Sequence, residues 1–320
     1  MKKGTISILL ASLLLALFPV ASPEANWNGK TYLREYLDVI RNDFVPSQEQ
    51  LNSWEDKRIE QQIEITMQEV SLLRSLLSGM EKEGGPDSSY YLVSNIENDS
   101  VILESNANKS RPIASITKLM TAVVAREHLE KHDTITLTPQ MLSTYGQTPV
   151  LFEGLEIRSE ELLKASLIQS VNDAANALSH FNGKERFVSL MNTKAKELEM
   201  HNTSFSDSHG LNIENRSTAR DLMKLASYVH EEHPDLLEIS RNNDFWLPDR
   251  TGRDLKFKNT NNFYPISSYL GGKNGYLPQA GETSLALFEV QGKTVGITLL
   301  GSEDRKADIF SLLDRTAEKL

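Results

Sequence analysis

The chain has 320 residues, of which 39% are hydrophobic and 24% charged, which is enough for one large globular domain or two modest ones. Its 44 Asp and Glu residues outnumber its 34 Lys and Arg residues, and the net charge of -10 argues against a nucleic-acid-binding protein. The sequence contains no cysteine, so thiol nucleophiles, disulfides and Cys-ligated metal centres are excluded, and any chemistry must use hydroxyl, amine, carboxylate or imidazole groups.

The first segment has the pattern of an export signal. Lys2 and Lys3 precede a mainly apolar run over residues 6–20, as in a signal peptide. The run is shorter than the roughly 20 residues that comfortably span a bilayer. Pro19 and Pro23 stand where a signal peptidase prefers small residues, so residues 1–25 are expected to be either a cleaved signal or an N-terminal membrane tether. We therefore expect the protein in the periplasm or at the extracellular face of the cytoplasmic membrane.

Residues 26–83 have helical periodicity. Apolar residues recur three, four and seven positions apart, among them Ile59, Ile63, Val70, Leu73 and Leu77. This spacing predicts a long amphipathic helix after a shorter one near residues 32–40. The helices are expected to pack on the main domain or on a second copy of the chain, and a partner-binding stalk is the alternative. The Gly-Gly-Pro-Asp run at residues 84–87 ends the pattern, which places a helical extension at residues 26–86.

Residues 87–320 are expected to form one mixed α/β domain. Two short strand-like runs, residues 90–93 and 100–104, are separated by turn residues and predict a hairpin. Helical patterns dominate residues 116–233. Three further strand-like runs follow at residues 272–276, 283–290 and 294–300, and a closing helix is expected over residues 305–319. Strands at both ends of the domain predict a sheet that unites them.

Ser115 and Lys118 open a helical run and share a helix face, since they are three residues apart. A neutral lysine amine at this spacing can take the proton of the serine hydroxyl, which is the chemistry of an activated nucleophile. The usual pKa of lysine, near 10.4, must then be lowered by burial, by a second cation or by the helix N-terminus. Alone, the pair is a weak signal and is better explained as a capping serine and a solvated lysine.

Two later motifs give this pair a context. Ser170 and Asn172 form a Ser-x-Asn motif about 50 residues on, and Lys273, Asn274 and Gly275 form a Lys-x-Gly motif about 100 residues beyond that. Taken singly, the first is a polar loop and the second a turn. In this order and spacing, the three motifs are typical of serine β-lactamases and penicillin-binding proteins.

The surrounding sequence resembles the D-alanyl-D-alanine carboxypeptidases, the low-molecular-mass penicillin-binding proteins. The resemblance extends from Ser88 to Leu320 and includes residues 111–120 (RPIASITKLM), 153–175 (EGLEIRSEELLKASLIQSVNDAA) and 187–211 (FVSLMNTKAKELEMHNTSFSDSHGL). It implies a mixed α/β fold of the β-lactamase and transpeptidase type, in which helices flank an antiparallel sheet beside an all-helical lobe. It also implies a serine-type carboxypeptidase that removes the terminal D-Ala from peptidoglycan stem peptides and is inhibited by β-lactams, with no cofactor and no metal.

The resemblance assigns a role to each motif residue. Ser115 is the expected nucleophile and Lys118 its base, while Ser170 passes protons toward the leaving group. Asn172 is expected to hold the substrate amide, and Lys273 to supply the second cation that keeps Lys118 neutral. Gly275 and Tyr276 continue the substrate-binding strand, and the oxyanion hole is expected to use the backbone N–H groups of Ser115 and Tyr276.

Asn274 departs from the family pattern, which has Thr or Ser at this position to bind the substrate carboxylate. An asparagine amide also donates hydrogen bonds, so we expect Asn274 to contact that carboxylate. Lys293 and Thr294 stand where some relatives carry an arginine, whose bidentate grip a lysine cannot supply.

Three alternatives bear on function. A β-lactamase would need a deacylating carboxylate, and no Glu-x-x-Leu-Asn occurs between Ser170 and Lys273. A catalytically impaired peptidoglycan-binding or scaffold protein would make Asn274 a sign of decay. A zinc site is disfavoured, because His230 and His233 are three residues apart and not four; we expect a solvated helix end there and a structural role for His209.

Overall fold

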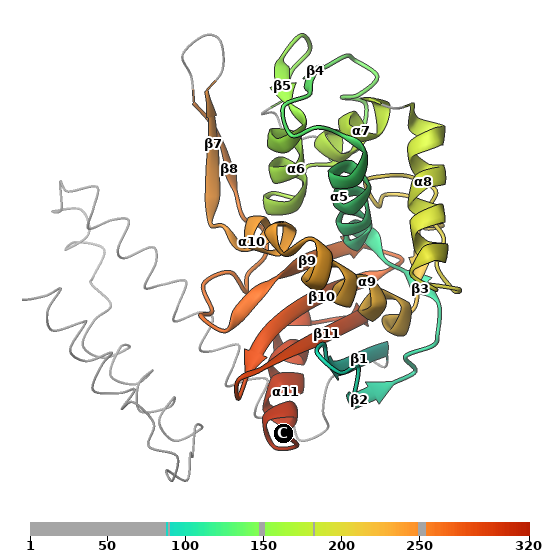
Figure 1. The fold of residues 1–320 in the computed structure, drawn as a ribbon, viewed down its shortest axis with the longest axis vertical. Coiled ribbons are helices and arrows are strands. Elements are labelled where there is room, and N and C mark those ends of the chain that lie inside the picture. Colours follow the sequence, from blue (N-terminus) through green and yellow to red (C-terminus); the bar gives the residue numbers. More distant parts are fainter. Residues whose placement is uncertain (1–87, 89, 147–150, 182, 249–253) are drawn as a thin grey trace, which may run out of the picture. The chain divides into compact units, whose positions relative to one another are not determined.

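The computed structural model describes residue 88 and residues 90–146, 151–181, 183–248 and 254–320. The expected signal or tether over residues 1–25 and the expected helical extension over residues 26–86 lie outside the described residues. Within these ranges, no helix is both long and apolar enough to cross a bilayer. The described part combines a five-stranded sheet with a lobe of helices (Figure 1).

The sheet is antiparallel throughout, in the order β2-β1-β11-β10-β9. The first two strands, β1 (Tyr90–Asn95) and β2 (Val101–Ser105), form the predicted hairpin. Strand β1 pairs along its whole length with β11 (Lys293–Ser302), which confirms that the sheet unites early and late strands. Strands β10 (Gly281–Val290) and β9 (Tyr269–Leu277) complete it, and β9 lies at the edge.

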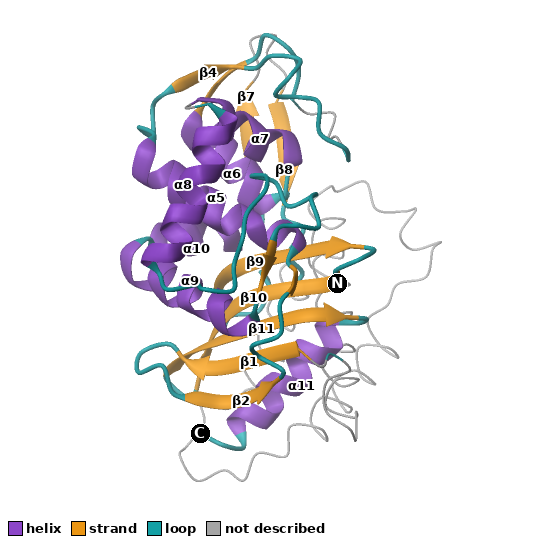
Figure 2. Ribbon diagram, turned by 90° about the vertical axis from the view of Figure 1, so that its right-hand side faces the viewer, coloured by secondary structure: helices purple, strands orange, loops and turns teal. Residues whose placement is uncertain are grey.

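Helices cover both faces of the sheet. Helix α9 (Ala219–Glu232) packs on one face and α11 (Arg305–Ala317) on the other (Figure 2). Because neither face meets water, residues 283–288 of β10 are all buried, without the alternation of a half-exposed strand. On the α11 side, the Phe263 ring packs edge-on against Phe288 and Phe310, with centroids 5.9 and 6.0 Å apart. These rings join the sheet to α11.

The helical lobe is built around α5 (Thr117–His128), whose residues 117–125 are all buried. A helix that is buried on every side must be enclosed by other elements. Four further helices belong to this region (Figure 1): α6 (Ser159–Ile168), α7 (Asn172–Phe181), α8 (Lys184–Glu197) and α10 (Pro234–Arg241). The N-terminus of α5 reaches the sheet, where β9 contacts the turn that precedes the helix.

Short strand pairs fix the connecting loops. They are β3 (Arg111–Pro112) with β6 (Arg216–Ser217), β4 (Thr134–Thr136) with β5 (Glu156–Arg158), and β7 (Asp244–Pro248) with β8 (Asp254–Lys258). The β3–β6 pair brings the segment before Ser115 alongside the end of the loop over residues 207–215. Two parts of the chain about 100 residues apart therefore meet at the first motif.

Candidate active site

Ser115 lies in a single 3-10 turn, η1 (Ala114–Ile116), directly before α5. We expected the serine in the first turn of the helix itself, and the structure places it one turn earlier. Ala114 has a φ of 49°, a left-handed conformation that is unfavourable for a residue with a side chain. Lys118 still faces the serine, and its Nζ lies 3.0 Å from Ser115 Oγ.

Lys118 is completely buried, and its Nζ has three oxygen neighbours. Besides Ser115 Oγ, they are Asn172 Oδ1 at 2.7 Å and the His209 carbonyl oxygen at 2.5 Å. Burial lowers the pKa of Lys118 to about 7, and the nearby Asp207 carboxylate opposes this effect. A lysine with such a pKa is neutral in a large fraction of molecules near pH 7, as a general base requires.

Asn172 begins α7, and its side chain joins three segments. Its Oδ1 accepts from Lys118, while its Nδ2 donates to the Tyr145 carbonyl oxygen at 2.9 Å. Ser170 lies two residues earlier in a left-handed conformation, with a φ of 60°. Its hydroxyl makes no hydrogen bond with any residue of the described ranges. The structure thus brings Asn172 to the Ser115–Lys118 pair and places Ser170 in the turn that leads to it.

Lys273 is the second buried lysine of this region, with 2% of its surface exposed. It lies on β9, and its Nζ donates to the Asn274 carbonyl oxygen at 2.8 Å. Burial holds the pKa of Lys273 well below its usual value, and repulsion by Lys118 and Arg305 adds to this effect. For Lys118, burial is the main cause of the lowered pKa, whereas the sequence led us to expect that role for the second cation.

Asn274 turns away from Lys273, because neighbouring side chains on a strand point to opposite faces. It pairs with Ser284 across the sheet, and Ser284 Oγ donates to Asn274 Oδ1 at 2.8 Å. Its Nδ2 donates to Asn261 Oδ1 at 3.1 Å, and the residue is buried. The amide is thus held by protein partners, and its expected contact with a substrate carboxylate finds no support in this geometry.

Two glycines approach the backbone of η1 from different segments. A Cβ on Gly275 of β9 would lie 2.6 Å from the backbone nitrogen of Ser115. A Cβ on Gly210, which has a φ of 87°, would overlap the carbonyl oxygen of Ala114. Only residues without a Cβ fit at these positions. Strand β9 therefore runs directly against Ser115 at Gly275. The next residue of the strand is Tyr276, whose side chain is exposed.

Comparison with known proteins identifies the family. The sequence model of the D-alanyl-D-alanine carboxypeptidase family matches residues 81–302. The chain belongs to this family.

Individual relatives agree with this assignment. The D-alanyl-D-alanine endopeptidase of Escherichia coli (strain K12) is 34% identical over 222 residues, which make up 65% of this chain and 69% of that protein. The D-alanyl-D-alanine carboxypeptidase DacF of Bacillus subtilis (strain 168) is 30% identical over 235 residues, 68% of this chain and 60% of that one. The solved structure of penicillin-binding protein D2 from Listeria monocytogenes, in its cefotaxime-bound form, has a TM-score of 0.64 at 27% identity and covers 73% of this chain and 98% of its own.

These findings confirm the expected fold and enzyme class. The chain has the mixed α/β fold of the penicillin-binding proteins, with an antiparallel sheet and helices, and it is a serine hydrolase of the D-alanyl-D-alanine carboxypeptidase family. The family acts on peptidoglycan stem peptides and binds β-lactams.

Sequence reasoning missed several residues that complete the site of this carboxypeptidase-family chain. Arg305, at the start of α11, donates to the Gly275 carbonyl oxygen at 3.1 Å and ion-pairs with Glu282. Asp207 organises the loop whose His209 carbonyl contacts Lys118. Residue 209 was expected to be structural, and its backbone proves to be part of the site. A contact through a backbone carbonyl places no constraint on residue type, so only the resemblance of the Ser-His-Gly-Leu stretch to the family pointed to this loop.

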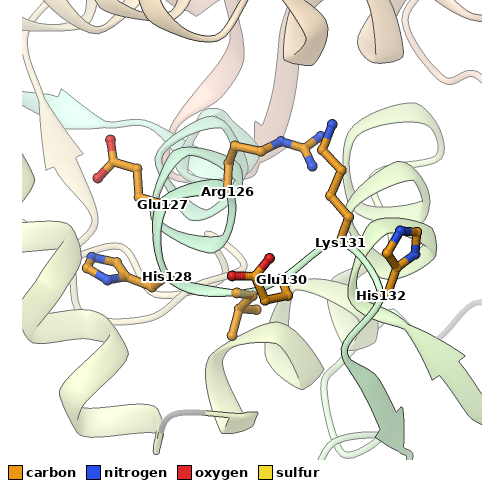
Figure 3. Close-up of a pocket in the computed structure, with 7 residues that line it drawn as sticks. Arg126, Glu127, His128, Glu130, Lys131 and His132 are labelled. Atoms are coloured by element: carbon orange, nitrogen blue, oxygen red, sulfur yellow. The ribbon is translucent and has the colours of Figure 1, made fainter.

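A separate cavity of about 410 Å³ lies at the C-terminal end of α5 and is lined by residues 126–132 (Figure 3). Two of its charged groups are paired with neighbouring helices: Arg126 contacts Glu160 at 2.6 Å, and Glu127 contacts Lys194 at 2.9 Å. Glu127 also contacts His233, which is only 15% exposed. The expected helix end before Pro234 is present, since α9 ends at Glu232 and both Glu231 and Glu232 are exposed. The His233 ring differs from the expectation, because it packs between Tyr228 of α9 and Glu127 of α5. Ser115 lies at the opposite end of α5.

Proposed function

We propose that the protein is a D-alanyl-D-alanine carboxypeptidase that works through an acyl-enzyme on Ser115. The observation that carries this proposal is the pair of Ser115 Oγ and the buried Lys118 Nζ, 3.0 Å apart, with the pKa of Lys118 lowered to about 7. A half-buried hydroxyl beside a neutral amine is a nucleophile beside its base. Membership of the D-alanyl-D-alanine carboxypeptidase family supports the same chemistry.

Acylation would begin with attack of Ser115 Oγ on the carbonyl carbon of the penultimate D-Ala. The hydroxyl proton passes to Lys118, and the oxyanion is held by the backbone N–H groups of Ser115 and Tyr276. Collapse of the tetrahedral intermediate breaks the peptide bond, and a proton relayed through Ser170 leaves on the amine of the terminal D-Ala. Water then hydrolyses the ester to restore the Ser115 hydroxyl and release the shortened peptide.

Cationic groups near β9 would recognise the substrate carboxylate. Lys273, the first residue of the Lys-x-Gly motif, is buried on β9. Arg305 donates a hydrogen bond to the carbonyl oxygen of Gly275 on the same strand. The pKa of Lys273 is held low by burial and nearby cations in the free protein, and a bound carboxylate would favour its charged form beside the Arg305 guanidinium. Asn172 would bind the amide of the acyl-side peptide. Because Asn274 is held by Asn261 and Ser284, we assign it to the support of β9 and not to contact with the carboxylate.

Endopeptidase action is the second candidate. The relatives from Escherichia coli and Haemophilus influenzae, 34% and 35% identical, are both named D-alanyl-D-alanine endopeptidase. An endopeptidase would use the same acyl-enzyme but release a second stem peptide where a carboxypeptidase releases free D-Ala. The leaving group would then be larger, and the acylation chemistry unchanged.

We propose further that the enzyme is exported and acts in the periplasm or at the extracellular face of the cytoplasmic membrane. The charged and apolar pattern of residues 1–20 supports this location, since it is typical of a signal peptide or N-terminal tether. The helical periodicity of residues 26–83 supports self-association through that segment.

Incubation with a purified stem pentapeptide and, separately, with a cross-linked peptide dimer tests the proposal. Release of free D-Ala from the pentapeptide by the wild type but not by Ser115→Ala is expected. Cleavage of the dimer alone would select the endopeptidase. Cleavage of neither, with retained binding to peptidoglycan, would favour the scaffold, and rapid turnover of nitrocefin would favour a β-lactamase.

A further inference from the structure

The loop over residues 207–215 contacts the expected base and the segment that leads into the turn of the expected nucleophile. The His209 carbonyl oxygen accepts from Lys118 Nζ at 2.5 Å, and the preceding carbonyl, that of Ser208, accepts from Thr121 Oγ1 at 2.6 Å. Lys118 and Thr121 are one helical turn apart on α5. The Asn215 carbonyl oxygen accepts from Ile113 N at 3.0 Å, just before η1. The loop thus holds the start of α5 and the turn of Ser115 together.

A neutral amine has two N–H donors and one lone pair, and the neighbours of Lys118 Nζ decide where each points. The His209 carbonyl oxygen and Asn172 Oδ1 are acceptors only. The assignment of Asn172 is fixed because its Nδ2 donates to the Tyr145 carbonyl. Ser115 Oγ is the one neighbour of the three that can donate. When Lys118 is neutral, its two N–H groups therefore go to residues 172 and 209, and its lone pair is aimed at the Ser115 hydroxyl.

Asp207 holds the His209 carbonyl in place. Its buried carboxylate accepts from four donors: His209 N at 3.0 Å, Gly210 N at 2.6 Å, Asn212 N at 2.8 Å and Asn215 Nδ2 at 2.7 Å. Asn215 is also buried, and its Oδ1 accepts from Asp207 N at 3.2 Å and from Ser206 N at 2.6 Å. A carboxylate that gathers so many donors defines one loop conformation.

We infer that Asp207 is a positioning residue for acyl transfer: through the loop that it organises, it fixes the His209 carbonyl and thereby aims the Lys118 amine at Ser115. This inference rests on the proposed function, in which Lys118 is the base. In the described part of the chain, no hydrogen bond or ion pair joins Asp207 to Ser115, so its action on the nucleophile passes through residues 209 and 118.

The charge of Asp207 adds a signature that a purely structural residue would not have. Its carboxylate raises the pKa of Lys118 against the effect of burial. Burial lowers the pKa of His209 to about 4, so that ring is neutral wherever Lys118 titrates. The other charged groups that face this region are Lys273 from β9 and, around His209, Asp173 from α7 and Lys184 from α8. Removal of the Asp207 charge should therefore move the titration of Lys118 to lower pH.

The test is the pH dependence of acylation by a fluorescent penicillin in the full chain. For Asp207→Asn we expect the plateau rate to fall by at least about tenfold, part of the roughly 10²–10⁴-fold that a positioned general base contributes, and the acidic limb to move to lower pH. Asp221→Asn is the matched control, because Asp221 is an equally buried aspartate that holds another loop through Asn202 N at 2.7 Å. Asp207→Ser, whose hydroxyl can accept from N–H groups two and three residues on, replaces Asp207→Asn if that variant does not fold.

The outcomes separate clearly. A plateau within about twofold of the Asp221→Asn value, the scatter expected of a substitution without a specific mechanism, would overturn the inference. So would a lower plateau whose acidic limb stays in place or moves to higher pH, because Asp207 would then act through folding or solvent exclusion alone. A wild-type protein that takes up no penicillin would overturn the proposed function and this inference with it.

Discussion

Gly275 of β9 packs against the backbone nitrogen of Ser115 so closely that a Cβ would lie 2.6 Å from it. The expected oxyanion hole needs this contact, since one donor belongs to Ser115 and the other to Tyr276, the residue after Gly275. The third residue of the Lys-x-Gly motif thus acts through the absence of a side chain.

Gly275→Ala is expected to separate the two donors. Loss of one oxyanion donor lowers rates by roughly 10²–10³-fold, so acylation by a fluorescent penicillin should slow by at least about 10²-fold. Gly296→Ala in β11 is the matched control: its added Cβ would meet the side-chain ends of Met223 and Ile96, which can shift, and lies on another strand. Equal acylation rates in the two variants would contradict the role of this contact.

Acylation by the wild type should rise with pH through about 7. The neutral amine of Lys118 is the reactive form, and burial lowers its pKa to about 7, so the rate is lost as pH falls below that value. Lys118→Met, which has a similar volume and no amine, should lose the acidic limb together with most of the rate. Circular dichroism would check that this variant is folded. If the acidic limb of the pH–rate profile persists in Lys118→Met, the titrating group is not Lys118.

Ligand binding should take up protons at Lys273. In the free protein, burial and the cations Lys118 and Arg305 hold the pKa of Lys273 well below its usual value. The neutral form of its amine is therefore favoured relative to an exposed lysine. A bound carboxylate favours the charged form and raises this pKa, so affinity for an anionic ligand should fall as pH increases. Calorimetry on Ser115→Ala in buffers of different ionisation enthalpy measures the uptake. A ligand with a carboxamide in place of the carboxylate is the control, and proton release on binding would contradict the account.

Asn274→Thr, which restores the usual family residue, should weaken the fold without accelerating acylation. The Asn274 amide bonds Asn261 and Ser284 on the far face of β9. Loss of these bonds should lower the free energy of unfolding by about 1 kcal/mol. The acylation rate should stay within about twofold of the wild type, as for a substitution that leaves the reacting groups in place. A clear increase in rate would show that residue 274 meets the substrate after all.

The sequence predicted the architecture well wherever local patterns were strong. The β1–β2 hairpin, the three late strands and the closing helix were all expected, because turn residues and apolar runs mark them directly. The long helical stretch over residues 116–233 was expected only in outline. Its division into separate helices depends on loops such as residues 207–215, which are held by side-chain contacts like those of Asp207.

The motif residues of the site could be predicted from the sequence, whereas the residues that hold them in position could not. The spacing of Ser115, Lys118 and Asn172 brought these side chains together as expected. The contacts of Asn274 with Asn261 and Ser284 were not expected, because the face on which a strand residue points depends on the register with its neighbour, which the sequence does not display. The His209 carbonyl and Gly210 were overlooked because backbone contacts and close approaches depend on tertiary packing.

Intact-mass spectrometry of the protein after treatment with benzylpenicillin is the most direct test of Ser115 as the nucleophile. We expect a gain of one penicillin mass on the wild type, located by peptide mapping on Ser115, and no gain on Ser115→Ala. Peptide mapping of the same sample also reports the N-terminus of the mature chain. An adduct on Ser115→Ala equal to that on the wild type, or no adduct on a folded wild-type protein, would contradict the assignment of Ser115 as the nucleophile.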